Sequence, residues 1–156
     1  MKRICSMICL AVALCALMGC SVKNKEPMTA NQFKTTMESK GFTVKDNTES
    51  ANGDSSYQSI YVSADETKYS FEYYFMTDVE SAKNVFSYAA SNLDSTYKDD
   101  SSAVILSNET DESGKYEVSA SDYYCVVWQN KNTVLYMTSY IDSKAEAASI
   151  LKDLGY

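Results

Sequence analysis

The chain has 156 residues, with 14 basic against 21 acidic side chains, no histidine and a formal net charge of −7. Because nucleic-acid phosphates are bound by clusters of Lys and Arg, we expect no nucleic-acid partner for so acidic a chain. Without histidine, neither a Ser-His-Asp triad nor a Cys-His pair can form, and a catalytic zinc site lacks its usual ligand.

Residues 1–19 have the layout of an export signal. Lys2 and Arg3 precede an apolar stretch from residue 4 to residue 18, which is shorter than the roughly twenty residues of a membrane-spanning helix. The stretch ends in Leu17-Met18-Gly19-Cys20, which resembles the lipobox of bacterial lipoproteins. The resemblance implies removal of residues 1–19 and attachment of a diacylglycerol to the Cys20 thiol. An ordinary secretory signal cut at another bond is the alternative.

On that resemblance, residues 20–27 are a lipidated cysteine with a short polar tether, and residues 28–156 are one globular domain. Removal of residues 1–19 from the 156-residue chain leaves 137 residues, enough for a single core, with 12 basic and 21 acidic residues and a charge of −9. An acidic body is not attracted to anionic lipid, so the acyl chains on Cys20 provide the expected contact with membrane lipid. The expected location is the cell membrane, facing outside the cytoplasm.

The first half of the domain is predicted as one helix and three strands. A helix is predicted over residues 29–40, because Thr29 and Gln32 match a capping box and Gly41 can end the helix. Strand-like runs follow at residues 42–45, 57–64 and 68–76. The third run has aromatic residues at alternate positions, the period of a strand with one buried face: Tyr69, Phe71, Tyr73 and Phe75.

The second half begins with the longest predicted helix, over residues 78–97, for which Thr77 is the expected cap. Its apolar residues recur at three- and four-residue spacing, which indicates a stripe that packs on a sheet. Four strand-like runs follow, at residues 103–107, 116–120, 123–129 and 133–140.

Two local signals complete the second half. Asn130-Lys131-Asn132 predicts a tight hairpin, because Asn tolerates left-handed backbone angles. Ser143 and Glu146 predict the cap of a last helix, which Gly155 would end.

These elements predict an α+β fold with three helices and a mostly antiparallel sheet of six to seven strands, in the order α-βββ-α-βββ(β)-α. The helices are expected to pack on one face of the sheet. Thr29 and Thr77 each precede a helix that is followed by a meander. A tandem duplication and a coincidence of common motifs both account for this pattern.

The sequence predicts no catalytic residues, no cofactor and no metal site. Cys125 lies among strand-forming residues without a basic neighbour, so a buried, inert thiol is expected. The glycines are well separated, and no phosphate-binding loop is present. The acidic runs at residues 99–100 and 109–112 are typical of solvated loops, although paired carboxylates can in principle run hydrolysis.

Tyrosine is the residue type in surplus, with 13 Tyr against 5 Phe. Tyr74, Tyr124 and Trp128 lie beside aromatic neighbours in predicted strands, which makes them candidates for an interaction surface on an open sheet face. The alternative is that tyrosine serves only as a strand former on a half-buried surface.

The globular part resembles small bacterial lipoproteins of unknown function, a resemblance that rests specifically on the leader alone. Three functions stay open at this point. The first is a non-enzymatic binding module that contacts a protein or glycan of the cell envelope. The second is a cell-surface enzyme that uses carboxylates, and the third is a structural or assembly lipoprotein of a membrane complex. The lack of catalytic motifs favours the first and argues against an enzyme.

Overall fold

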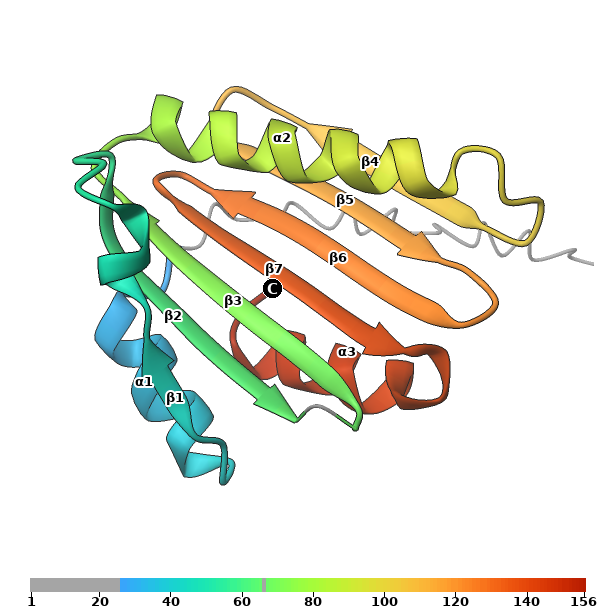
Figure 1. Cartoon of the computed structure of the whole chain (residues 1–156), viewed down its shortest axis with the longest axis horizontal. Helices are drawn as coiled ribbons and strands as arrows, with labels where there is room; N and C mark the ends of the chain where they lie inside the picture. Colours follow the sequence, from blue (N-terminus) through green and yellow to red (C-terminus); the bar gives the residue numbers. More distant parts are fainter. Residues whose placement is uncertain (1–25, 66) are drawn as a thin grey trace, which may run out of the picture.

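The computed structural model describes residues 26–156 except residue 66. The expected leader and Cys20 lie outside the described residues, as does most of the tether. The chain forms an α+β fold in the predicted order, with three helices and a seven-stranded antiparallel sheet (Figure 1). Among the described helices, none is long and apolar enough to cross a membrane.

The helices are α1 (Ala30–Ser39), α2 (Val79–Tyr97) and α3 (Lys144–Asp153). The strands are β1 (Val44–Asp46), β2 (Tyr57–Asp65), β3 (Tyr69–Met76), β4 (Val104–Glu109), β5 (Ser113–Ser119), β6 (Tyr123–Asn130) and β7 (Thr133–Tyr140). Two 3-10 turns, η1 (Thr48–Ala51) and η2 (Ile141–Ser143), precede β2 and α3.

The sheet consists of two antiparallel meanders that meet in its centre. Its order is β1-β2-β3-β7-β6-β5-β4, so the last strands of the two meanders, β3 and β7, are neighbours. Their pairing places Glu72 opposite Tyr136 and Tyr73 opposite Leu135. This long-range pairing joins the two halves of the chain into one sheet.

The helices cover both faces of the sheet, which corrects the expectation of a single covered face. On the first face, here the α1–α3 face, Phe33 and Met37 of α1 and Leu151 of α3 share a core with Tyr73 and other sheet residues. On the second face, here the α2 face, Phe86 and Leu93 of α2 pack in a separate core. In Figure 1, α2 lies in front of the sheet and α3 behind it. Two cores therefore sandwich the central strands.

The predicted aromatic row of β3 faces the α1–α3 core. The ring of Tyr73 stacks on Phe33 of α1, with ring centres 4.7 Å apart. The Tyr73 hydroxyl donates a hydrogen bond to the carbonyl oxygen of Met28, which ties the start of the domain to the sheet. The period-two pattern thus identified the buried face of this strand correctly.

The two halves share a meander but differ in the side on which their first helix lies. The two meanders meet at the antiparallel pair β3 and β7, so the two-fold axis that would exchange them is perpendicular to the sheet. A rotation about such an axis keeps each face of the sheet on its own side. It would therefore place α1 and α2 on the same face. Since α1 and α2 lie on opposite faces, no single rotation relates the halves.

The helix caps agree with the sequence at α1 and differ at the other two helices. Thr29 and Gln32 form the predicted capping box. At α2 the N-cap is Asp78 instead of Thr77, and its carboxylate accepts a 2.7 Å hydrogen bond from the Ser81 amide. Both side chains can cap a helix, but the residue with extended backbone angles immediately before the first turn is Asp78.

At α3, Ser143 makes no capping hydrogen bond, because it belongs to the 3-10 turn η2 that leads directly into the helix. Glu146 binds Lys68 and Tyr69 instead of capping. In the β6–β7 hairpin, Lys131 takes the positive φ of 49° that was expected for an asparagine. The turn nevertheless pairs Asn130 with Thr133, so the hairpin itself is confirmed.

Gly114 in β5 gives a test of the α2 core. A Cβ at this position would lie 2.7 Å from two ring atoms of Phe86, much closer than normal contact. We expect Gly114→Ala to lower the free energy of unfolding by about 1–3 kcal/mol through overpacking. In a double-mutant cycle, Phe86→Leu should relieve part of this cost, so the double variant should lose less stability than the two single losses summed. Strictly additive losses in urea unfolding would contradict this packing.

Candidate functional site

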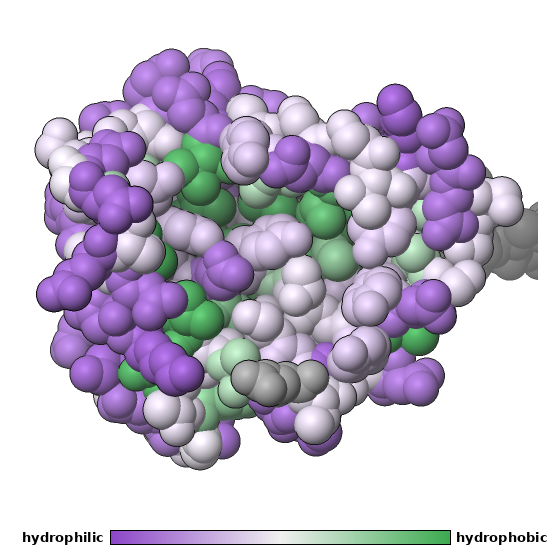
Figure 2. Space-filling model, in the orientation of Figure 1, coloured by the Kyte–Doolittle hydropathy of each residue, from purple (hydrophilic) through white to green (hydrophobic). Residues whose placement is uncertain are grey.

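A cavity lies on the α2 face, between α2, the β2–β3 hairpin and the loop before β2. It has a volume of about 600 Å³, within the range of roughly 300–1,000 Å³ typical of ligand sites. Figure 2 shows this face, with a hollow of nearly neutral and apolar surface between more hydrophilic margins. We call this cavity the groove; its lining residues are Asp54, Ser56, Tyr57, Glu72, Tyr74, Met76, Ser81, Asn84, Val85, Tyr88, Ala89, Asn92, Val134 and Tyr136.

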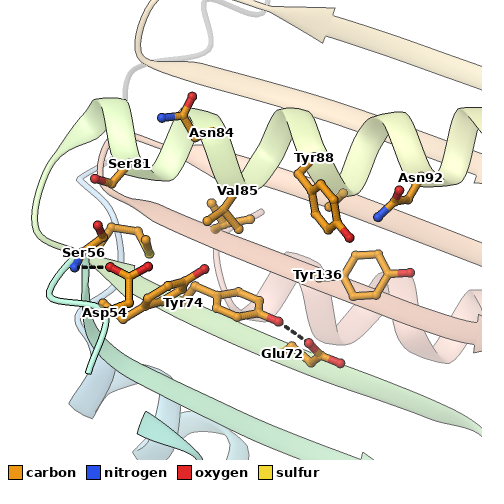
Figure 3. A pocket seen from close by; sticks show the side chains of 14 residues that line it. Asp54, Ser56, Glu72, Tyr74, Ser81, Asn84, Val85, Tyr88, Asn92 and Tyr136 are labelled. Carbon is orange, nitrogen blue, oxygen red and sulfur yellow. Dashed lines mark hydrogen bonds between the residues drawn. The ribbon is translucent and has the colours of Figure 1, made fainter. Parts of the chain in front are cut away.

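Four tyrosines from four different elements line the groove. Tyr57 and Tyr74 come from the β2–β3 hairpin, with ring centres 6.2 Å apart, and Tyr136 comes from β7. Tyr88 projects from α2 above them and is 73% exposed (Figure 3). Aromatic rings offer apolar faces while their hydroxyls stay available for hydrogen bonds, so this lining suits a ligand with both kinds of group.

Glu72 is the acidic residue beside Tyr74 and Tyr136 in the groove. Its carboxylate accepts a hydrogen bond from the Tyr74 hydroxyl, as Figure 3 shows, and its cross-strand partner on β7 is Tyr136. Directly opposite residues of an antiparallel pair have Cβ atoms about 4.5–5.5 Å apart, so Glu72 has Tyr136 beside it as well as Tyr74. The half-buried carboxylate takes part in none of the six ion pairs found among the described residues.

The charge of Glu72 acts on both neighbouring phenols. Burial raises the pKa of Tyr74 well above its usual value, and the hydrogen bond to Glu72 raises it further. Burial also raises the pKa of Tyr136 to about 12, with further contributions from Cys125 and Glu72. These tyrosines are therefore neutral hydrogen-bonding groups at neutral pH.

Asp54 is the second carboxylate of the groove and lies in the loop before β2, at one end of the groove. It accepts a 2.9 Å hydrogen bond from the Ser56 amide, and this bond is the main reason that the pKa of Asp54 is lowered. A carboxyl group held ionised in this way is a poor general acid, because acid catalysis requires a raised pKa. Both carboxylates instead give the groove a negative charge, and its lining contains no lysine.

The three predicted surface residues do not form one surface. Tyr74 lines the groove on the α2 face, whereas Tyr124 and Trp128 belong to the α1–α3 face. Alternation along β6 puts both residues of that strand on the same side, and the β3–β7 register puts Tyr74 on the other.

Tyr124 is not accessible to a partner, which corrects its assignment to an interaction surface. It is only 4% exposed, with Lys144 Nζ 4.7 Å from its ring centre. Trp128 is half-buried between the ring of Tyr156 and Lys115, whose Nζ lies 4.8 Å from the indole. Both aromatic residues are thus occupied by contacts within the chain.

Cys125 is buried beneath α2, as the sequence predicted for this thiol. It is 3% exposed, and burial raises its pKa, which makes it a weak nucleophile. Among the described residues, no group of three or more acidic or cysteine side chains is arranged to hold a metal ion.

Sequence reasoning missed most of the groove, although two signals pointed to it. Tyr88 falls outside the apolar stripe of α2, next to Ala89, which belongs to the stripe. Glu72 is the charged residue inside the aromatic run of β3. Their meeting across the sheet could not be read from the sequence, because it depends on the β3–β7 register.

We compared the chain with models of protein families, with curated proteins and with solved structures, and none of them matches it.

The Tyr136 phenol provides a test of the groove's electrostatics. We expect Glu72→Gln to move the pKa of Tyr136 from about 12 towards the ordinary value of 10.0, since the variant removes a negative charge that opposes ionisation. Ring-carbon chemical shifts of Tyr136 during an alkaline titration measure this change. The matched control is Glu49→Gln, an exposed residue of η1 outside the groove. Equal Tyr136 titrations in Glu72→Gln and the wild type would contradict the arrangement.

The same shift has a consequence for stability. Since the folded-state pKa of Tyr136 is raised, its contribution to the free energy of unfolding is complete below pH 10 and is lost as the pH rises through about 12. The free energy of unfolding that is lost between pH 10 and about 12 should be smaller in Glu72→Gln than in the wild type.

Proposed function

We propose that this protein is a non-enzymatic binding module of the cell envelope, which takes a ligand into the groove on its α2 face. The observation that carries the proposal is the groove itself, with about 600 Å³ of space, four tyrosines and a glutamate, Glu72, that forms no ion pair with the described residues. The ionised state of Asp54 and the engagement of Glu72 by Tyr74 support binding over acid–base chemistry. The rigid sheet that supplies the floor favours a preformed site.

The proposal includes a lipid anchor at Cys20 that holds the domain outside the cytoplasm. Its support is the Leu17-Met18-Gly19-Cys20 motif behind a charged start and a short apolar run. Two acyl chains suffice for stable attachment to a bilayer where a single chain is marginal. An anchored binding module would therefore work within reach of the membrane surface.

The anchor is tested by the mass of the protein purified from its own host. We expect a chain that begins at Cys20 and carries a diacylglycerol on its thiol, and we expect Cys20→Ser to be lost from the membrane fraction. An unacylated protein with its leader intact would refute the anchor, and the groove would then act at another location.

The binding role is tested by photocrosslinking in the host, with the crosslinker at residue 88 on the rim of the groove. Ala89→Trp should abolish the adduct, because Ala89 lines the groove and a large side chain there fills it. The matched control is Ser87→Trp on the same helix, an exposed residue outside the groove, which should leave the adduct unchanged.

A second control places the crosslinker at residue 106, where Leu106 is 59% exposed on β4. We expect no matching adduct from this position. If the adduct at residue 88 persists in Ala89→Trp, or if it forms equally from residue 106, the groove is not the binding site.

A further inference from the structure

On its α1–α3 face the chain holds a lysine ammonium close to both an aromatic ring and a carboxylate. On the α1–α3 face, Lys115 lies with its ammonium 4.8 Å from the ring centre of Trp128, and it forms a 2.5 Å ion pair with Glu117. Lys115 and Trp128 are direct cross-strand partners. An ammonium held between an aromatic face and a carboxylate gains from both cation–π attraction and charge pairing.

The groove repeats two of these three components. Glu72 and Tyr136 are direct cross-strand partners, and Tyr74 adds a second ring beside the carboxylate. No lysine lines the groove, and no described cation pairs with Glu72. The missing component is therefore a cation, which would have to come from the ligand.

The surroundings reinforce this charge preference. Asp54 adds a second negative charge at the other end of the groove, and the whole chain carries a net charge of −7. An acidic protein raises the local concentration of cationic ligands and disfavours anionic ones. Phosphorylated or otherwise anionic ligands are thus poor candidates for this site.

The length of the groove indicates what carries the cation. Its lining on α2 runs from Ser81 to Asn92, which is about 16 Å at 1.5 Å per residue. An extended peptide of about five residues has this length at roughly 3.3 Å per residue. The half-exposed apolar side chains of Val85 and Ala89 offer contacts to such a segment, whereas a small free amine would fill only a fraction of the 600 Å³.

We propose that the groove binds an extended peptide segment of about five residues whose Lys or Arg side chain sits between Glu72 and the Tyr136 ring. This inference rests on the proposed binding function and adds the class of ligand. Tyr88, at the rim, covers the segment from the helix side.

The test measures binding of defined probes to the full chain, isolated in detergent, by the chemical shifts of the Val85 and Ala89 methyl groups. The first probe is the pentapeptide acetyl-Gly-Ser-Lys-Ser-Gly-amide. The second is the same peptide with a neutral Nε-acetyl-lysine, the third has Glu in place of Lys, and the fourth is n-butylammonium. We expect the lysine peptide to bind at least about tenfold more tightly than each of the others, a difference of about 1.4 kcal/mol.

Glu72→Gln should abolish the preference for lysine over acetyl-lysine, while Glu49→Gln should retain it. Gln has nearly the same size as Glu and still offers an acceptor to the Tyr74 hydroxyl. A change in the lysine preference therefore reports the loss of the negative charge. The lysine preference should also weaken as salt is added, because exposed charge pairs are screened.

Several results would overturn the inference. They are equal binding of the acetyl-lysine peptide, survival of the preference in Glu72→Gln, or the absence of methyl shifts with every probe. Binding of n-butylammonium as tight as that of the lysine peptide would overturn the peptide assignment. If the photocrosslink at residue 88 still depends on Ala89 in any of these cases, the class of ligand is wrong and the binding role stands.

Discussion

The pairing of β3 with β7 is the contact on which the rest of the structure depends. It joins the two meanders and sets which side chains face each side of the sheet. A slip of one residue would turn Glu72 into the apolar α1–α3 core and expose Tyr73 on the other side. Burial of an unpaired carboxylate is costly, so the core on one face fixes the register that builds the groove on the other.

The openness of the α2 face follows from simple dimensions. A helix is about 10 Å wide and strands are spaced about 4.8 Å apart, so one helix is too narrow to cover a seven-stranded sheet. On the α1–α3 face two helices share the sheet, but α2 lies alone and contacts β5, β6, β7 and part of β3. The side chains on the part of the α2 face that α2 leaves uncovered must therefore tolerate contact with water and still pack against apolar neighbours. Tyrosine meets both demands, which gives the surplus of this residue a structural reason as well as a functional one.

Local signals predicted most of the fold. The capping box at Thr29, the aromatic period of β3 and the hairpin at Lys131 all depend on residues close in sequence, and each element formed where it was expected. The side on which α2 packs was predicted wrongly, because it depends on how the chain crosses the sheet between β3 and β4. Tyr124 was placed on a surface for the same reason: nothing near it in sequence reveals that Lys144 covers its ring. The groove combines residues from β2, β3, α2 and β7, so only Tyr74 among them was identified in advance.

The most direct test of this account is the set of nuclear Overhauser contacts made by the Tyr136 ring. We expect contacts from this ring to the side chain of Glu72 on β3 and to the methyl groups of Val127 on β6, the two cross-strand neighbours of Tyr136 on the α2 face. Contacts from the Tyr136 ring to Leu151 of α3 would place it on the opposite face. That result would contradict the register, the groove and the role proposed for Glu72 together.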